Sequence, residues 1–190
     1  DLEPTTELGS SAFWNTKEDA YSALMGAYAA SREVFFADYV WDGMGDFQRT
    51  GWSRGNGSAY EGNRYRGPGY LGSHDPYYQA LFGAVNRVNY VIENITLRML
   101  PSAQEADLGL LNEMIAEARF LRGMIYHRLI SMYGDVPYID QIVYDNSEVA
   151  DVTRIPISQI KDAIIEDFTF AVETLPDSPR EHGRTAKPVA

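Results

Sequence analysis

The sequence predicts an all-α protein of tetratricopeptide-like helical hairpins, in which a long irregular loop rich in glycine and aromatic residues separates the first two helices. Three observations support this prediction. Four segments carry apolar residues at alternating spacings of three and four, the period of an amphipathic helix. A short connection joins the second and third segments, as in an antiparallel hairpin. Nine of the 16 glycines fall between residues 36 and 73. We expect residues 1–190 to form a single domain, although the usual tetratricopeptide consensus is not matched.

The first two helices have recognisable start signals. The first is predicted over about residues 17–34, because Thr16 can cap it and Asp19 follows three residues later. The second is predicted over about residues 76–96, where Pro76 stands at the first helical position and its missing N–H costs no hydrogen bond. Their apolar stripes include Ala20, Leu24, Leu81, Val85 and Val88.

The third and fourth helices show the same period. The third is predicted over about residues 103–133, because Ser102 and Glu105 match a capping box at its start. Gly134 is a stop signal at its other end. The fourth is predicted over about residues 157–175, with apolar residues again three or four apart.

The connection between about residues 37 and 73 has no helical periodicity and is exceptionally long. A loop of this length inside a compact domain is usually either functional or disordered. Disordered segments are poor in aromatic residues. This one contains Tyr39, Trp41, Phe47, Trp52, Tyr60, Tyr65 and Tyr70. We therefore expect a functional loop rather than plain disorder.

Composition and motifs exclude several classes of function. The 16 basic and 27 acidic residues give a net charge of −11, a field that repels nucleic acid and anionic lipid. There is no cysteine, no zinc-protease spacing among the three histidines, no nucleophile elbow and no Walker sequence. Asp42 and Asp46 offer oxygen ligands suited to calcium, but their spacing is not that of an EF-hand. We expect no enzymatic activity, no metal and no cofactor, although sequence alone leaves a carboxylate pair for glycoside hydrolysis open.

The most specific motif lies at residues 117–139 and reads "EARFLRGMIYHRLISMYGDVPYI". It resembles the signature of the SusD/RagB family of Bacteroidetes outer-membrane lipoproteins. Other stretches resemble the family in the same order: "FWNTKEDAYSALMGAY" (13–28), "NRVNYVIENI" (86–95) and "RIPISQIKDAIIEDFTFAVETLP" (154–176). The stretch "GRTAKPVA" (183–190) resembles the family's "GR-T-K" element imperfectly. The resemblance covers nearly the whole chain.

This resemblance implies a non-catalytic protein that captures oligosaccharide or polysaccharide for a TonB-dependent, SusC-like transporter. It implies a surface-exposed location at the outer membrane, with membrane contact only through a lipid anchor on a cysteine that this chain lacks. Family members are several hundred residues long, and the chain resembles their amino-terminal portion. The alternative is a RagB-like helical-repeat scaffold that binds peptide or protein. A glycoside hydrolase is a further alternative.

The long loop has the residue types that a glycan site needs. Flat aromatic rings cover the C–H face of a sugar, and Asn, Asp and Arg side chains hydrogen-bond its hydroxyl rim. Glycines let the backbone approach the ligand closely. The predicted ligand-binding residues are Trp41, Asp42, Trp52, Arg54, Asn56, Tyr60, Asn63, Tyr65 and Tyr70. The alternative for the tyrosines is that they pin the loop onto the helices, while Trp14 is expected to pack into the core.

The charged residues of the signature motif have a structural interpretation. Their positions next to the apolar stripe and at the helix end favour arginines that pair with acidic groups or with carbonyls at helix ends. A direct role in ligand binding is the alternative. The residues concerned are Glu117, Arg119, Arg122, His127 and Asp135.

Overall fold

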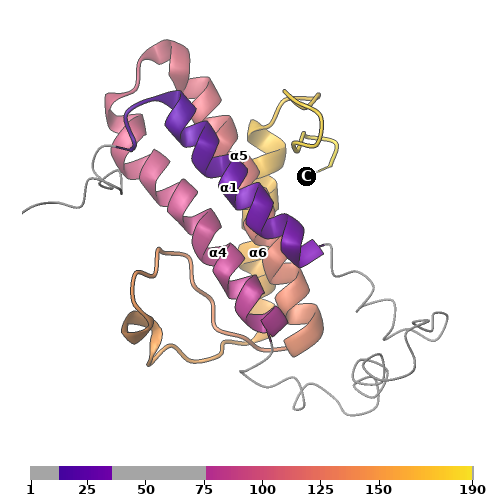
Figure 1. Ribbon diagram of the computed structural model, residues 1–190. Helices are drawn as coiled ribbons and strands as arrows, with labels where there is room; N and C mark the ends of the chain where they lie inside the picture. The colour runs from indigo at the N-terminus through magenta and orange to yellow at the C-terminus, as the bar shows by residue number, and fades with distance from the viewer. Residues whose placement is uncertain (1–12, 36–75, 190) are drawn as a thin grey trace, which may run out of the picture.

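The computed structural model describes residues 13–35 and 76–189, and this part of the chain is helical. Its four α-helices are α1 (Lys17–Phe35), α4 (Pro76–Asn94), α5 (Glu105–Tyr133) and α6 (Ile157–Thr174). Successive helices of this part run in opposite directions and pack side by side (Figure 1). The predicted all-α fold is therefore confirmed, and no β-strand occurs in the described ranges.

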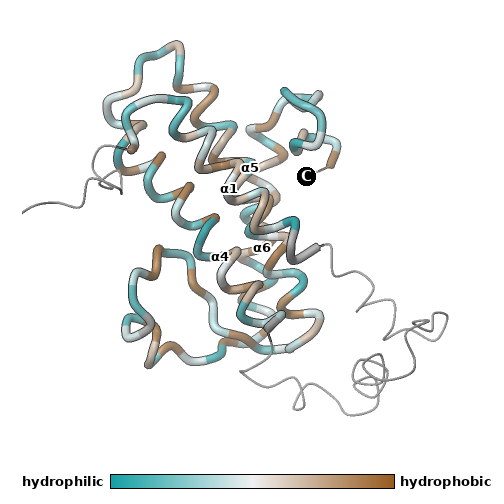
Figure 2. Tube along the Cα trace, in the orientation of Figure 1, coloured by the Kyte–Doolittle hydropathy of each residue, from teal (hydrophilic) through white to brown (hydrophobic). Residues whose placement is uncertain are grey.

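Helix α5 is the centre of the bundle, because it packs on α1, α4 and α6. The run from Met114 to Ala118 is buried without interruption, which shows that α5 is covered on all sides over this stretch. Hydrophobic and hydrophilic residues alternate along the neighbouring helices in Figure 2, as expected for helices with one face on the core. Gly123 permits the close approach of α6, since a Cβ atom there would lie 2.7 Å from Cε1 of Phe168.

The predicted N-terminal cap of α1 is present. Thr16 Oγ1 accepts a hydrogen bond from the Asp19 N–H (3.2 Å), and Asp19 Oδ2 accepts one from the Thr16 N–H (2.8 Å). Trp14, just before this cap, belongs to the core as predicted and is only 5% exposed. Its indole N–H donates to the hydroxyl of Tyr90 on α4 at 3.4 Å. The cap and the indole together fix the start of α1 against α4.

The predicted capping box at Ser102 and Glu105 is wrong. The chain leaves α4 through a π-helical turn (Ile95–Met99) and a 3-10 turn (Leu100–Ser102), so α4 also ends two residues before the predicted residue 96. Ser102 belongs to that second turn, and its hydroxyl donates to carbonyl groups of the preceding residues. Gln104 is the N-cap residue of α5 and makes no side-chain capping bond. Ser102 matches a capping box in sequence, but it forms part of the 3-10 turn and therefore does not cap α5.

The "YGDVP" motif forms the corner between α5 and α6. Gly134 ends α5 with a φ of 73°, a left-handed value that disfavours any residue with a side chain. Asp135 then accepts a hydrogen bond from the N–H of Ile157, the first residue of α6, at 3.0 Å. Val136 forms an isolated antiparallel bridge with Ile155, whose N–H donates to the Val136 carbonyl at 3.1 Å. The motif therefore joins the end of one helix to the start of the next.

The residues between these two tied points, 137–154, form a closed loop that we call the strap. The strap contains a single 3-10 turn (Asn146–Val149). It is drawn in orange in Figure 1, where it lies beside the amino-terminal half of α4.

The carboxy-terminal segment is fastened to the bundle by buried polar groups. Arg184 forms two hydrogen bonds to Glu117 of α5, one of them at 3.0 Å. The Tyr28 hydroxyl donates to the same carboxylate at 2.7 Å and accepts from the N–H of Thr185 at 2.9 Å. Burial, reinforced by the negative charge of Glu117, raises the pKa of Tyr28 far above its ordinary value. This cluster gives a structural reason for the joint presence of the "EARFLR" and "GRT" motifs.

Candidate functional site between α4 and the strap

All nine residues predicted to bind ligand lie outside the described residues, so they stay a prediction. They are Trp41, Asp42, Trp52, Arg54, Asn56, Tyr60, Asn63, Tyr65 and Tyr70. The structure does show where this stretch of sequence is attached to the bundle. The end of α1 and the start of α4 lie toward the end of the bundle that also carries the strap (Figure 1). Both helix ends that lead into this stretch of sequence are therefore on the same side of the bundle as the strap.

A hollow of about 630 Å³ lies there, between the first turns of α4 and the strap. Its aromatic lining comes from Tyr78 and Phe82 of α4 and from Tyr144 of the strap. The Tyr78 ring lies 4.8 Å from that of Phe82 and meets Tyr133 edge-on at 5.0 Å, so its position is fixed by packing. Tyr144 is 72% exposed and is therefore free to meet a ligand. The hollow combines a fixed aromatic floor with an exposed aromatic rim.

The strap is held against α4 by side chains one helical turn apart. Asn86 makes two hydrogen bonds to the backbone of Val143, donating to its carbonyl (2.9 Å) and accepting from its N–H (2.8 Å). Glu93, two turns further on, accepts from the N–H of Ile142 at 3.2 Å. Asn89 lies between them on the same face of α4 and is buried. These side chains supply partners that the strap backbone would otherwise find in a sheet or helix.

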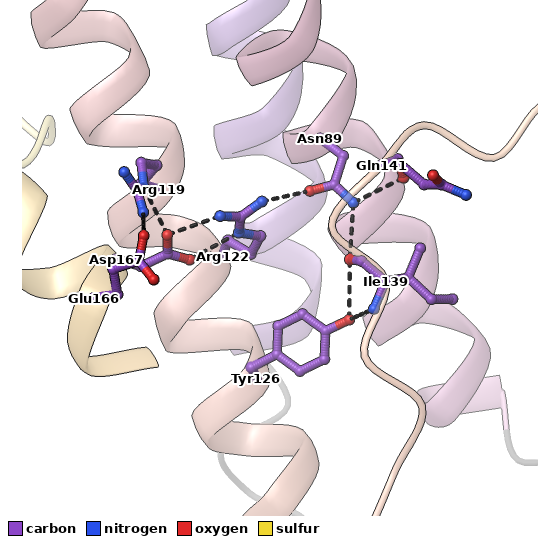
Figure 3. A network of polar contacts seen from close by, with 8 residues as sticks. All are labelled: Asn89, Arg119, Arg122, Tyr126, Ile139, Gln141, Glu166 and Asp167. Carbon is purple, nitrogen blue, oxygen red and sulfur yellow. Dashed lines mark hydrogen bonds and ion pairs between the residues drawn. The ribbon is translucent and has the colours of Figure 1, made fainter. Parts of the chain in front are cut away.

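Asn89 links the strap to the interior of the bundle, as Figure 3 shows. Its amide nitrogen donates to the carbonyls of Ile139 and Gln141, each at 3.0 Å. Its amide oxygen accepts from the guanidinium of Arg122 at 3.2 Å. Arg122 in turn forms two hydrogen bonds to Asp167 of α6, at 2.7 and 2.8 Å. Because Arg122 can only donate, it turns the amide oxygen of Asn89 inward and the amide nitrogen toward the strap.

Arg119 and Arg122 of the signature motif confirm the structural interpretation. Arg122 is buried, which by itself would lower its pKa, but the hydrogen bonds and charge of Asp167 outweigh burial and raise it. Arg119 also bonds Asp167, at 2.7 Å, and reaches the exposed Glu166 at 3.0 Å. The acidic partners lie in the middle of α6 rather than at a helix end. Both arginines thus join α5 to α6 and do not face the hollow.

Tyr126 provides a second link between α5 and the strap. Its hydroxyl accepts from the N–H of Ile139 (2.7 Å) and donates to the carbonyl of the same residue (3.1 Å) (Figure 3). Burial raises the pKa of this hydroxyl far above its ordinary value, so the group is a neutral donor and acceptor. Both backbone polar groups of Ile139 are thereby bonded to Tyr126.

The strap side of the hollow is acidic. The strap contains four acidic residues, Asp140, Asp145, Glu148 and Asp151, and one basic residue, Arg154. Burial raises the pKa of Tyr78, and the charge of Arg154 opposes this rise, so Arg154 acts on the helix side of the hollow. The Asp145 carboxylate accepts from the N–H of Ser147 at 2.8 Å, and hydrogen bonding from Ser147 lowers the pKa of this carboxyl. Glu148 in turn accepts from the N–H groups of Tyr144 and Asp145. These carboxylates shape the turn that presents Tyr144, and they leave a negative field around it.

The sequence contains one signal for this hollow. Tyr78, Phe82 and Asn86 follow each other at intervals of four, so they lie along one face of α4, next to the core stripe. The four-residue spacing shows that the three side chains share one face of α4, but it does not show which part of the chain packs opposite that face. The strap residues carry no periodic signal at all, because the strap is neither helix nor strand.

Residues 13–35 and 76–189 contain no group of three histidine, aspartate or glutamate side chains able to hold a metal ion. No helix within these ranges is long and apolar enough to cross a membrane.

Comparison with known proteins gives consistent results. Residues 50–188 match the SusD-like family described as "starch-binding associating with outer membrane". SusD-like protein P2 of Formosa agariphila is 28% identical over 196 residues, which cover all of this chain and 38% of that protein. A laminarin-binding SusD-like protein of known structure has a TM-score of 0.70 at 23% identity, over 91% of this chain and 37% of its own. For a SusD homologue from Bacteroides thetaiotaomicron the TM-score is 0.73 at 23% identity, over 96% of this chain and 36% of its own.

The stacked hairpins place the protein among tetratricopeptide-like helical scaffolds, the fold of these solved structures. The chain belongs to the SusD-like family, since the family match covers well over half of its residues. It spans 38% of the length of the curated relative that it matches.

Proposed function

We propose that the protein is a non-catalytic, surface-exposed glycan-binding protein that captures oligosaccharide or polysaccharide for a TonB-dependent, SusC-like outer-membrane transporter. The observation that carries this proposal is the family match over residues 50–188, because that family is described as starch-binding and associated with the outer membrane. We propose that residues 1–190 act as one domain and that a lipid anchor outside this chain holds the protein at the membrane.

The mechanism is capture without bond cleavage. The aromatic residues between 37 and 73 that are predicted to bind ligand, above all Trp52 and Trp41, stack on the C–H faces of sugar rings. Neighbouring polar residues of that stretch hydrogen-bond the hydroxyl groups. Stacking on a flat ring costs little side-chain entropy, so a few rings suffice for binding. The four-helix bundle supplies the rigid base to which both ends of this stretch are attached.

Native affinity electrophoresis tests the proposal. The intact protein is run in gels that contain starch, laminarin, galactomannan, alginate or polygalacturonate, alongside the Trp52→Ala and Trp41→Ala variants. The control is Leu97→Ala, which removes a side chain that is 66% exposed in the turn after α4. We expect retardation by at least one polysaccharide, and a loss of about tenfold in affinity when either indole is removed.

The outcomes separate the competing functions. Retardation that both tryptophan variants retain keeps the glycan-binding function and excludes the predicted stacking residues. No retardation by any glycan contradicts the function and favours a scaffold that binds peptides. Release of shorter sugars from the polysaccharide would identify a glycoside hydrolase instead.

A further inference from the structure

We infer that the hollow between α4 and the strap is a separate binding subsite for neutral sugar units, with Tyr144 as its principal stacking residue. This inference rests on the proposed glycan-binding function. It concerns residues of α4 and the strap, none of which is among the predicted ligand-binding residues.

The size and lining of the hollow suit a short stretch of sugar rings. Its volume of about 630 Å³ lies within the range of roughly 300–1,000 Å³ that small-ligand sites occupy. Phe82 and Tyr78 offer apolar ring surface on the helix side, and Tyr144 offers it on the strap side. The hydroxyls of Tyr78 and Tyr144 are at once donors and acceptors, which matches the hydroxyl rim of a sugar. A ligand with apolar faces and a polar edge therefore fits both elements of the lining.

The walls of the hollow are fixed independently of any ligand. Asn86 bonds both backbone groups of Val143, the residue next to Tyr144. The N–H of Tyr144 itself donates to Glu148 at 3.3 Å. A site with walls already in place loses little conformational entropy when a ligand binds. Hydrogen bonds within the chain itself thus hold the walls of the hollow.

The charges around the hollow select the class of glycan. The strap brings four acidic residues, Asp140, Asp145, Glu148 and Asp151, against one basic residue, Arg154, so its net charge is negative. The α4 side chains that line the hollow, including Gln79 and Asn86, are uncharged. A carboxylated or sulfated sugar would be repelled by this field, whereas a neutral sugar would not. The occupant is therefore a neutral hexose or pentose chain rather than a uronate or sulfated one.

The decisive experiment measures binding of the intact protein and its Tyr144→Ala and Tyr144→Phe variants to starch, laminarin and galactomannan, which are neutral, and to alginate and polygalacturonate, which are anionic. Covering roughly 50 Å² of apolar ring surface is worth about tenfold in affinity, so Tyr144→Ala should weaken binding of a neutral polysaccharide by about that factor. Tyr144→Phe keeps the ring and should restore most of the binding. Leu97→Ala, an exposed apolar residue in the turn after α4, should change nothing.

The possible results distinguish failure of the subsite from failure of the proposed function. Binding of a neutral glycan that Tyr144→Ala leaves unchanged overturns the subsite while the proposed function stands. Loss of binding in both Tyr144 variants, with unchanged thermal stability, contradicts ring stacking. Binding of the anionic glycans alone overturns the neutral class. If the wild-type protein binds none of these glycans, the proposed function fails and the subsite fails with it.

Discussion

Removal of the Asp167 carboxylate should destabilise the protein more than any surface change. The side chains of Arg122 and Asp167 are only 8% and 3% exposed, and Asp167 accepts two hydrogen bonds from Arg122 and one from Arg119. In Asp167→Ala the Arg122 guanidinium stays buried beside Asn89 without a counter-charge. Breaking a buried ion pair by removing one partner costs about 3–5 kcal/mol. For a protein of this size each kcal/mol lowers Tm by about 2–4 °C, so we expect a loss of about 6–20 °C.

Calorimetry or urea denaturation measures this loss, and two variants control for it. Glu166→Ala removes the neighbouring carboxylate, which is 77% exposed and pairs with Arg119, and should cost at most about 1 kcal/mol. Arg122→Met combined with Asp167→Leu removes both buried charges and should recover much of the stability lost in the single variant. Two results would refute the view that an unpaired buried arginine causes the loss. One is a cost below about 1 kcal/mol for Asp167→Ala. The other is a double variant whose loss of stability equals the summed losses of the two single variants.

Two further predictions follow from the geometry of α5. Gly134 has a φ of 73°, so Gly134→Ala should lose about 1–3 kcal/mol in urea denaturation, whereas Gly109→Ala, in the helix with open space around it, should gain up to about 1 kcal/mol. Equal effects of these two changes would contradict the role of Gly134 as a stop. Burial raises the pKa of Tyr126, so above pH 10 the unfolded chain loses this proton while the folded chain keeps it. The free energy of unfolding should therefore decrease by up to about 1.4 kcal/mol for each pH unit above pH 10. This decrease should be less steep in the Tyr126→Phe variant. Identical alkaline slopes for the two proteins would exclude Tyr126 as the source.

The polar network also explains what the signature motif does. Arg122 connects α6 to Asn89 on α4, and Asn89 and Tyr126 both hold Ile139 in the strap. Arg122 therefore bonds α6 and α4 directly and is linked to the strap through Asn89. Figure 3 shows this chain of contacts from Asp167 to the strap. Arg122, a charged residue of the signature motif, thus helps to hold the walls of the candidate site in place through Asn89.

Local sequence determined the helices of this protein. The periodicity predicted four helices in the right places, and the cap at Thr16 and the stop at Gly134 are both present. These signals act between residues at most four apart, so they can be read without knowledge of the fold. Even so, the failed capping box at Ser102 shows that a neighbouring turn can override a correct local pattern.

Tertiary structure alone decided the partners of the polar residues and the position of the hollow. Arg122 and Asp167 are 45 residues apart, Asn89 and Gln141 are 52 apart, and Glu117 and Arg184 are 67 apart. No spacing rule relates residues so distant, because they become neighbours only when the hairpins stack. The hollow likewise needs two surfaces, the face of α4 that carries Tyr78 and Phe82 and the strap, and the strap is placed by hydrogen bonds from Asn86 and Asn89 of α4. Helix formation depends on neighbours in sequence, whereas the candidate site depends on which helix faces meet in space.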